Sequence, residues 1–282
     1  MGIDLHTHST ASDGTDSPAS LVEAAAAAGL STVAITDHDT VAGWSEAAEA
    51  AQRVGVRLVR GVEISCEDES RSVHVLGYLV DPSDAALAEE LARSRESRAT
   101  RLARMVELLA ADGIPVTYDE VLAQVPPGAT PGRPHIADAL VAAGAVAHRD
   151  EAFARWLFDD SPYYVRHYAP EPGRAVELVQ AAGGVCVLAH PFATRRGRAT
   201  PDALVERLAG LGLAGIEADH PDHDAAARAR VRRLAEGLGL LVTGSSDYHG
   251  LGKTVRLGQE STDPAVLAEI EACASGVAVV PE

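Results

Sequence analysis

Residues 3–38 read IDLHTHSTASDGTDSPASLVEAAAAAGLSTVAITDH, and they indicate the fold class of the whole chain. An apolar strand is predicted over 3–5, and a helix follows Ser17, a favoured N-cap residue placed directly before Pro18. Gly29 ends this helix, and a second apolar strand covers 32–36. This alternation of strand and helix predicts an α/β fold.

The alternation continues along most of the chain. A helix is predicted over 43–54, ended by Gly55, and is followed by strands over 57–64 and 73–80. Further strands are predicted at 185–189, 215–218 and 240–243, separated by helices near 172–182, 200–211 and 222–238. We therefore expect a distorted parallel (β/α)7 barrel, whose active site lies at the C-terminal ends of the strands.

The middle of the chain interrupts this rhythm. A long helix is predicted from residue 84 to about 112, a second begins at Arg133-Pro134, and a third lies near 150–158. We expect residues 95–165 to form a small helical insertion that covers the active site, and residues 1–94 and 166–282 to form the barrel. Arginines recur every three residues on the long helix, and this stripe faces either water or an anion: Arg95, Arg98, Arg101 and Arg104.

Composition limits the classes of partner. The 282 residues carry a net charge of -17, which argues against unspecific binding of long nucleic acid. Three well-separated cysteines suit reduced thiols, no apolar span is long enough for a membrane helix, and the first strand leaves no room for a cleavable signal. The expected location is the cytoplasm, without membrane partners.

Imidazole and carboxylate side chains gather where the predicted strands end. In an extended chain residues i and i+2 share a face, so His6 and His8 point the same way, as do Asp247 and His249. Nitrogen and oxygen donors without a thiolate cluster suit manganese, iron or zinc, and we expect manganese. The sequence predicts a multinuclear, hydrolytic metal centre with nine ligands: His6, His8, Asp13, His38, Glu63, His74, His190, Asp247 and His249.

Some nearby polar residues have two interpretations. Asp13 precedes Gly14, so it is either a ligand or an ordinary turn residue. Asp4 lies on the face of His6 and either orients an imidazole or serves packing. After the sixth predicted strand, His223 is a candidate for substrate contact, whereas Asp222 fits a helix N-cap and His220 a solvated loop. Neither histidine is expected to bind metal.

Five short motifs resemble those of the polymerase and histidinol phosphatase (PHP) superfamily of metal-dependent phosphoesterases, and they occur in the order that this family uses. They are His6-Thr7-His8-Ser9, Thr36-Asp37-His38-Asp39, Gly61-Val62-Glu63, Ala189-His190-Pro191 and Ser246-Asp247-Tyr248-His249. The helical segment and Gly132-Arg133-Pro134-His135 resemble the branch of nucleotide bisphosphate 3′-phosphatases and 5′-to-3′ exoribonucleases.

The resemblance implies two or three divalent metal ions. The first is held by His6, His8, Glu63 and Asp247, and Glu63 bridges to a second that also takes His74 and His190. A third takes Asp13, His38 and His249.

The resemblance also implies the reaction, in which a metal-activated hydroxide attacks the phosphate ester of a nucleotide, such as a nucleoside 3′,5′-bisphosphate, or of a short RNA 5′ end. The residues expected to bind substrate are Arg98, Arg101, Arg133 and His135. Two alternatives are a histidinol-phosphate phosphatase and a non-catalytic metal-binding accessory module.

Overall fold

A computed structural model describes residues 2–158, 161–193 and 198–281. Its centre is one seven-stranded sheet in which the strands are neighbours in chain order. They are β1 (Gly2–Asp4), β2 (Leu30–Ile35), β3 (Arg57–Asp68), β4 (Arg71–Tyr78), β5 (Val185–Leu188), β6 (Gly215–Asp219) and β7 (Leu241–Gly244). A parallel bridge between Thr7 and Tyr248 joins the two edges just beyond β1 and β7. The predicted α/β barrel of seven strands is confirmed.

One strand departs from the parallel arrangement. β4 runs antiparallel to both β3 and β5, whereas the remaining neighbours are parallel. Only Glu69 and Ser70 connect β3 to β4, and both have positive φ, as in a two-residue hairpin turn. Because so short a link cannot make the crossover that parallel strands need, β4 must reverse direction.

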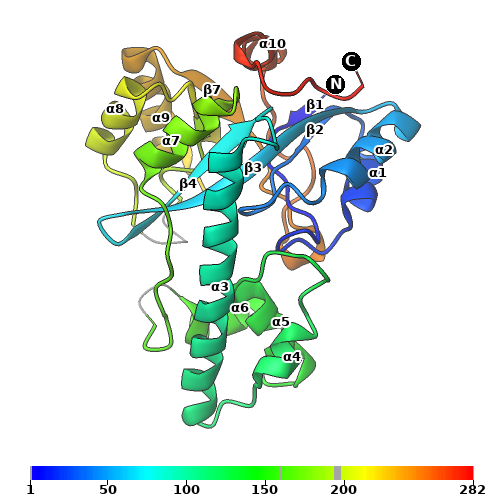
Figure 1. Ribbon diagram of the computed structural model, residues 1–282, viewed down its shortest axis with the longest axis vertical. Coiled ribbons are helices and arrows are strands. Elements are labelled where there is room, and N and C mark those ends of the chain that lie inside the picture. The colour runs from blue at the N-terminus through cyan, green and yellow to red at the C-terminus, as the bar shows by residue number, and fades with distance from the viewer. Residues whose placement is uncertain (1, 159–160, 194–197, 282) are drawn as a thin grey trace.

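Six helices cover the barrel: α1 (Pro18–Ala27), α2 (Trp44–Val54), α7 (Pro172–Ala181), α8 (Asp202–Gly210), α9 (Ala225–Leu238) and α10 (Pro264–Cys273). The predicted helix ends are confirmed for α1 and α2, since Ser17 accepts the backbone N–H of Ser20 and Gly55 takes a left-handed conformation. Inside the barrel, side chains such as Leu5, Leu76 and Tyr78 form a separate apolar core. α10 and both chain termini lie at one end of the barrel (Figure 1).

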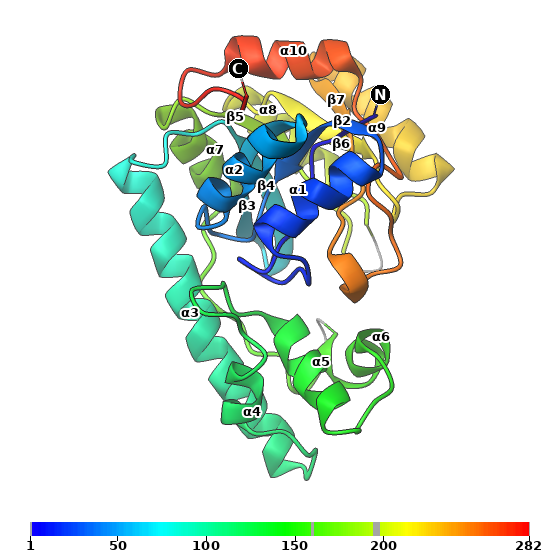
Figure 2. The same ribbon diagram turned by 90° about the vertical axis from the view of Figure 1, so that its right-hand side faces the viewer.

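The helical segment lies at the opposite end (Figure 2). It comprises α3 (Ala85–Ala111), α4 (Tyr118–Leu122), α5 (Arg133–Ala142), α6 (Arg149–Ala152) and the π-helical turn η1 (Phe153–Leu157). These helices have their own apolar core, which includes Leu102, Leu109 and Ile136. Two contacts join them to the loop after β1: Thr130 N–H donates to Ala11 O at 2.9 Å, and Arg149 Nη1 to Asp13 O at 3.3 Å.

No helix among the described residues combines the length and the hydropathy needed to cross a membrane.

Candidate metal centre

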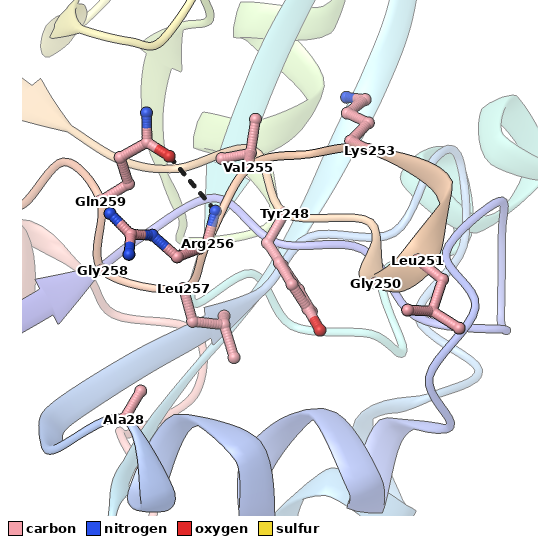
Figure 3. Close-up of a pocket in the computed structure, with 10 residues that line it drawn as sticks. All are labelled: Ala28, Tyr248, Gly250, Leu251, Lys253, Val255, Arg256, Leu257, Gly258 and Gln259. Atoms are coloured by element: carbon pink, nitrogen blue, oxygen red, sulfur yellow. Dashed lines mark hydrogen bonds between the residues drawn. The ribbon is translucent and has the colours of Figure 1, made fainter. Parts of the chain in front are cut away.

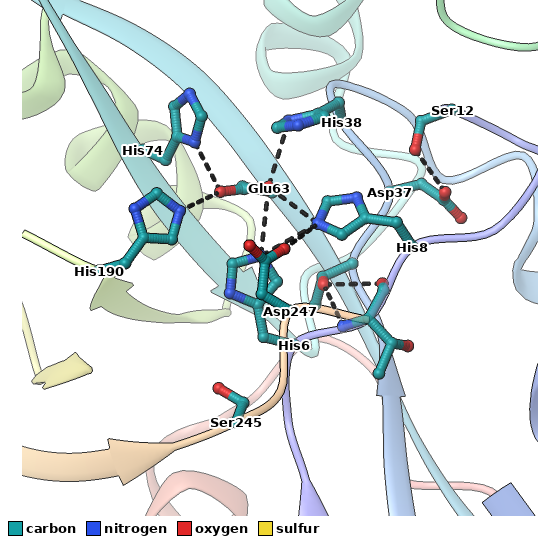
Figure 4. Close-up of polar contacts among 12 residues, drawn as sticks. His6, His8, Ser12, Asp37, His38, Glu63, His74, His190, Ser245 and Asp247 are labelled. Carbon is teal, nitrogen blue, oxygen red and sulfur yellow. Dashed lines mark hydrogen bonds and ion pairs between the residues drawn. The ribbon is translucent and has the colours of Figure 1, made fainter. Parts of the chain in front are cut away.

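The nine residues proposed as ligands converge at the barrel end that faces the helical segment. His6, His8 and Asp13 follow β1, His38 follows β2, Glu63 lies in β3 and His74 in β4. His190 follows β5, and a loop after β7 carries Asp247 and His249. Figure 4 shows side chains from these separate strands pointing toward Glu63.

Glu63 is the common contact of five imidazoles, and it is almost fully buried. Three ring nitrogens lie 3.1–3.2 Å from its Oε2, those of His6, His8 and His38. Its other oxygen, Oε1, lies 2.7 Å from His74 Nδ1 and 3.2 Å from His190 Nε2. Each carboxylate oxygen therefore faces a different set of imidazoles, as a carboxylate shared between two cations requires.

The two aspartates extend the cluster in different directions. Asp247 Oδ1 lies 3.3 Å from His8 Nε2 and 3.6 Å from His6 Nε2. Asp13 Oδ1 lies 3.3 Å from His249 Nε2, and its Oδ2 lies 4.0 Å from His38 Nε2. Asp13 thus points into the cluster from its turn.

Among the residues that the structure describes, four overlapping groups of side chains have ligand atoms close enough together to hold an ion. They are His8, Asp13, His38 and His249; His6, Glu63 and His190; His6, His8 and Asp247; and His38, Glu63 and His74.

The chemistry of this cluster fits divalent cations. His6 Nε2 and His8 Nε2 lie only 3.1 Å apart, and the buried His8 Nδ1 has no hydrogen-bond partner. Burial raises the pKa of the Glu63 carboxyl, but the neighbouring imidazoles, led by His38 and His6, outweigh burial and hold its pKa well below the usual range. The ionised Glu63 carboxylate and the imidazole nitrogens around it therefore form a set of ligands that suits divalent cations.

Three arginines lie beside this centre. Arg98 Nε donates to Asp39 Oδ2 at 2.7 Å, and its Nη2 donates to Ser65 Oγ. Arg101 is buried, with its guanidinium 4.7 Å from the centre of the Tyr164 ring, and Arg133 approaches the same ring at 5.2 Å. The arginines of the predicted stripe therefore differ in their surroundings. The Arg104 side chain is exposed and pairs with Glu107 on its own helix.

The pKa of His167 reflects burial and the positive charge of these arginines. Burial, together with the guanidinium groups of Arg98, Arg101 and Arg133, lowers the pKa of His167 to about 2. His167 Nδ1 lies 3.4 Å from Arg101 Nη1, and its buried Nε2 has no hydrogen-bond partner. Although the whole chain is acidic, this neighbourhood is strongly positive. The sequence did not single out His167, which has no flanking motif.

His135, the fourth residue expected to bind substrate, takes part in a helix cap. Its Nδ1 accepts the N–H of Gly132 at 3.0 Å, and the ring is buried. Burial lowers the pKa of His135, so the ring is neutral near pH 7.

The chain has counterparts among known proteins in both sequence and fold. The PHP domain model matches residues 4–124. A 3′,5′-nucleoside bisphosphate phosphatase of Chromobacterium violaceum is 35% identical over 251 residues, which span 89% of this chain and 88% of that protein. This chain belongs to the PHP family.

Other relatives agree with this assignment. A 5′-3′ exoribonuclease of Haemophilus influenzae is 35% identical, with 87% of this chain and 89% of that protein covered. A phosphoribosyl 1,2-cyclic phosphate 1,2-diphosphodiesterase of Eggerthella lenta is 36% identical, with coverage of 88% and 94%. The crystal structure of an inferred metal-dependent phosphoesterase from Bifidobacterium adolescentis superposes with a TM-score of 0.95 at 43% identity, covering 98% of this chain and 97% of that one. The PHP protein described here is a phosphoric ester hydrolase.

Around the PHP cluster, acidic residues hold the ligand loops in place. Asp37 accepts Ser9 N–H at 2.8 Å and Ser12 Oγ–H at 2.6 Å, which fixes the turn that carries Asp13. Asp4 accepts the N–H groups of Ser246 and Gly258. Asp4 Oδ1 also lies 3.5 Å from the backbone N of His6, so Asp4 orders the backbone of the loop after β7 and of His6 itself.

The residues after β6 contribute contacts that the sequence did not reveal. His220 is buried rather than solvated, and its Nε2 lies 3.3 Å from Asp247 Oδ2. Because His220 Nδ1 accepts Asp222 N–H, the ring proton is on Nε2 and is donated to Asp247. His223 is buried too, with its nitrogens bonded to Ala218 O and Phe192 N–H. Neither histidine belongs to the ion-holding groups found among the described residues.

Two hollows adjoin the PHP centre. The larger is lined by Ala28 and by residues of the segment after β7: Tyr248, Gly250, Leu251, Lys253 and Val255 to Gln259 (Figure 3). Lys253 links this hollow to the cluster, because it lines the hollow and its Nζ lies 2.9 Å from Asp247 Oδ2. The smaller depression is lined by His74 and His190 themselves. The smaller depression therefore opens directly onto candidate ligands.

Proposed function

We propose that this chain hydrolyses a phosphate ester of a nucleotide, with a nucleoside 3′,5′-bisphosphate or a short RNA 5′ end as substrate. The observation that carries this proposal is a group of three guanidiniums beside the anionic cluster: Arg98 donates to Asp39 and Ser65, and Arg101 and Arg133 both lie over the Tyr164 ring. In this proposal, one phosphate ester of the substrate is hydrolysed at the cluster, and a second anionic group of the same substrate binds the arginines. Residues 95–165 supply these arginines and cover the site.

We further propose how the nine ligands divide. His6, His8, Glu63 and Asp247 hold one ion, Glu63, His74 and His190 a second, and Asp13, His38 and His249 a third. Mixed nitrogen and oxygen donors favour manganese, with iron or zinc as alternatives. When bound, such ions supply a nucleophilic hydroxide at neutral pH and neutralise charge on the phosphate oxygens.

The arginines orient the substrate. Ser65 Oγ, which accepts from Arg98, also lies 3.5 Å from His38 Nδ1, so Arg98 is anchored next to the cluster. Arg101 and Arg133 share the Tyr164 ring and form a second cationic point. A planar guanidinium binds phosphate through two parallel hydrogen bonds, which fixes both distance and direction.

The two alternative functions, a histidinol-phosphate phosphatase and a non-catalytic accessory module, do not need both the ligand cluster and the three arginines beside it. Histidinol phosphate carries one phosphate and a cationic amine, and the arginine cluster repels the amine. An accessory module does not need nine convergent donors. The name of the Eggerthella lenta relative prints a cyclic phosphodiester as its substrate. This compound has a cyclic phosphate across positions 1 and 2 of the ribose and a second phosphate elsewhere on the same sugar. It therefore belongs among the compounds to test.

The deciding assay compares several substrates with the manganese-loaded protein. They are adenosine 3′,5′-bisphosphate, adenosine 3′-monophosphate, a 5′-phosphorylated oligoribonucleotide, phosphoribosyl 1,2-cyclic phosphate and histidinol phosphate. We expect the highest kcat/KM with the bisphosphate or the oligoribonucleotide. Preferred turnover of histidinol phosphate, or no turnover of any ester, contradicts the proposal.

Replacing Arg101 tests the second phosphate site. Charge-assisted hydrogen bonds contribute about 1.5–3 kcal/mol, so Arg101→Gln is expected to lower kcat/KM for the bisphosphate by about 10- to 150-fold, mainly through KM. The corresponding monophosphate should be affected far less, since it lacks the second anionic group. The measurement is the ratio of kcat/KM for the two substrates.

Arg104→Gln is the matched control, because Arg104 lies one turn further along α3 and its side chain is exposed. Since Arg101 is buried, Arg133→Ala provides a second variant in case Arg101→Gln folds poorly. Equal losses for bisphosphate and monophosphate in both variants would remove these arginines from substrate recognition.

We also propose the cytoplasm as the location, because Cys66, Cys186 and Cys273 are all free thiols. A small phosphorylated compound, rather than a long nucleic acid or a membrane, is the proposed partner.

A further inference from the structure

We propose that Glu217 is a positioning residue that prepares two candidate ligands, the His6 imidazole and the His190 backbone, before any cation binds. Glu217 lies in β6 and is fully buried. It does not occur in the ion-holding groups found within the described part of the chain. The inference rests on the metal centre proposed above, and it assigns a role to a carboxylate outside the ligand set.

The first contact holds the ring of His6. Glu217 Oε1 lies 3.3 Å from His6 Nδ1. On the opposite side of the same ring, Nε2 lies 3.2 Å from Glu63 Oε2. Glu217 therefore fixes the orientation in which Nε2 faces the cluster, and with a cation bound at Nε2 the ring proton is on Nδ1, where Glu217 accepts it. A carboxylate behind the ring of a ligand histidine makes the opposite nitrogen a better donor to a cation.

The second contact holds the backbone of His190. Glu217 Oε2 accepts the N–H of His190 at 2.9 Å. His190 has a φ of 25°, in the left-handed region that residues with a Cβ disfavour. This conformation directs the ring so that Nε2 lies 3.2 Å from Glu63 Oε1. The bond from an ionised acceptor compensates for the strained turn after β5.

The carboxylate that makes both contacts is itself fixed. Ser245 Oγ donates to Glu217 Oε1, and β6 is hydrogen-bonded between β5 and β7. Glu217 therefore reaches His6 with one oxygen and His190 with the other, and these histidines contact opposite oxygens of Glu63. One rigid side chain thus orients both halves of the cluster.

The substitution Glu217→Gln separates these contacts. A carboxamide has one accepting oxygen, so if it faces His190 N–H, the NH2 group faces His6 Nδ1 and cannot accept a hydrogen bond from it. If the amide is flipped, the NH2 group opposes His190 N–H. In either orientation one contact is lost while size and packing are kept.

The test uses two measurements that need no substrate. In the protein loaded with diamagnetic Zn²⁺, ¹⁵N NMR of the histidine rings is expected to show a proton on His6 Nδ1, and Glu217→Gln should change that signal. Titration with Mn²⁺ should give a dissociation constant about 10- to 100-fold higher for Glu217→Gln. The matched control is Glu236→Gln, since Glu236 is exposed on α9.

A folded Glu217→Gln protein with unchanged Mn²⁺ affinity and an unchanged His6 signal overturns the inference. A merely structural role would lower the melting temperature without altering either readout in the folded protein. If the variant fails to fold, the Zn²⁺-loaded wild type still decides, because a His6 ring that carries its proton on Nε2 contradicts the proposal. A wild type that binds Mn²⁺ but hydrolyses no nucleotide would contradict the proposed function alone.

Discussion

His8→Ala is expected to lower kcat/KM by about 10³-fold or more while the protein still folds. His8 Nε2 lies 3.1 Å from Glu63 Oε2 and 3.3 Å from Asp247 Oδ1, at the centre of the cluster. Bound cations contribute several kcal/mol to stabilising the transition state, and about 4 kcal/mol corresponds to roughly 10³-fold in rate. Turnover with saturating Mn²⁺ measures the effect, and circular dichroism confirms the fold.

The control for this variant is His148→Ala, because His148 is exposed on the helical segment and caps α6. Its removal should cost some stability and leave turnover unchanged. Activity within twofold of the wild type in folded His8→Ala would show that His8 takes no part in the reaction.

Glu63→Gln is expected to have the largest effect, with loss of bound metal and no measurable turnover. The carboxylate contacts imidazoles through both oxygens, and the amide of glutamine would turn an NH2 group toward one set of ring nitrogens. Both cations that share Glu63 are therefore lost. Metal content per chain, determined by elemental analysis after dialysis, measures this directly.

Stability without metal provides a second readout for the same variant. Because the pKa of Glu63 in the folded protein lies well below its ordinary value of 4.5, the ionised carboxylate stabilises the fold above pH 4.5. This contribution disappears as the pH falls further, through the pKa of the folded protein. Glu63→Gln should therefore unfold at lower urea concentration than the wild type at pH 7. Glu67→Gln, on the same strand, is the control. A full complement of metal in Glu63→Gln would refute the central position of Glu63.

Several parts of this site were predictable from local patterns. His6 with His8, and Asp247 with His249, follow strands at a spacing of two, which directs each pair to one side. Glu63 stands in an apolar strand, where a carboxylate needs a compensating positive charge. Such signals depend only on neighbouring residues.

Other features depend on how distant segments meet. The alternation of apolar residues in β4 is the same for either strand direction, and the Glu69-Ser70 turn lacks the Asn-Gly type of signal that marks a hairpin. Glu217 and His6 are 211 positions apart and meet only because the barrel brings β6 next to the end of β1. The sequence placed Arg101 and Arg104 in one stripe, but only the docking of α3 determines that Arg101 is buried and Arg104 exposed.

The central claim is that separate strands bring nine donors together to bind cations around Glu63. Anomalous diffraction at the manganese edge, from crystals grown with Mn²⁺, tests it most directly. We expect at least two peaks within coordination distance of Glu63, one also bound by His6, His8 and Asp247 and the other by His74 and His190. Fully formed crystals of active protein with no anomalous peak near Glu63 would contradict the account.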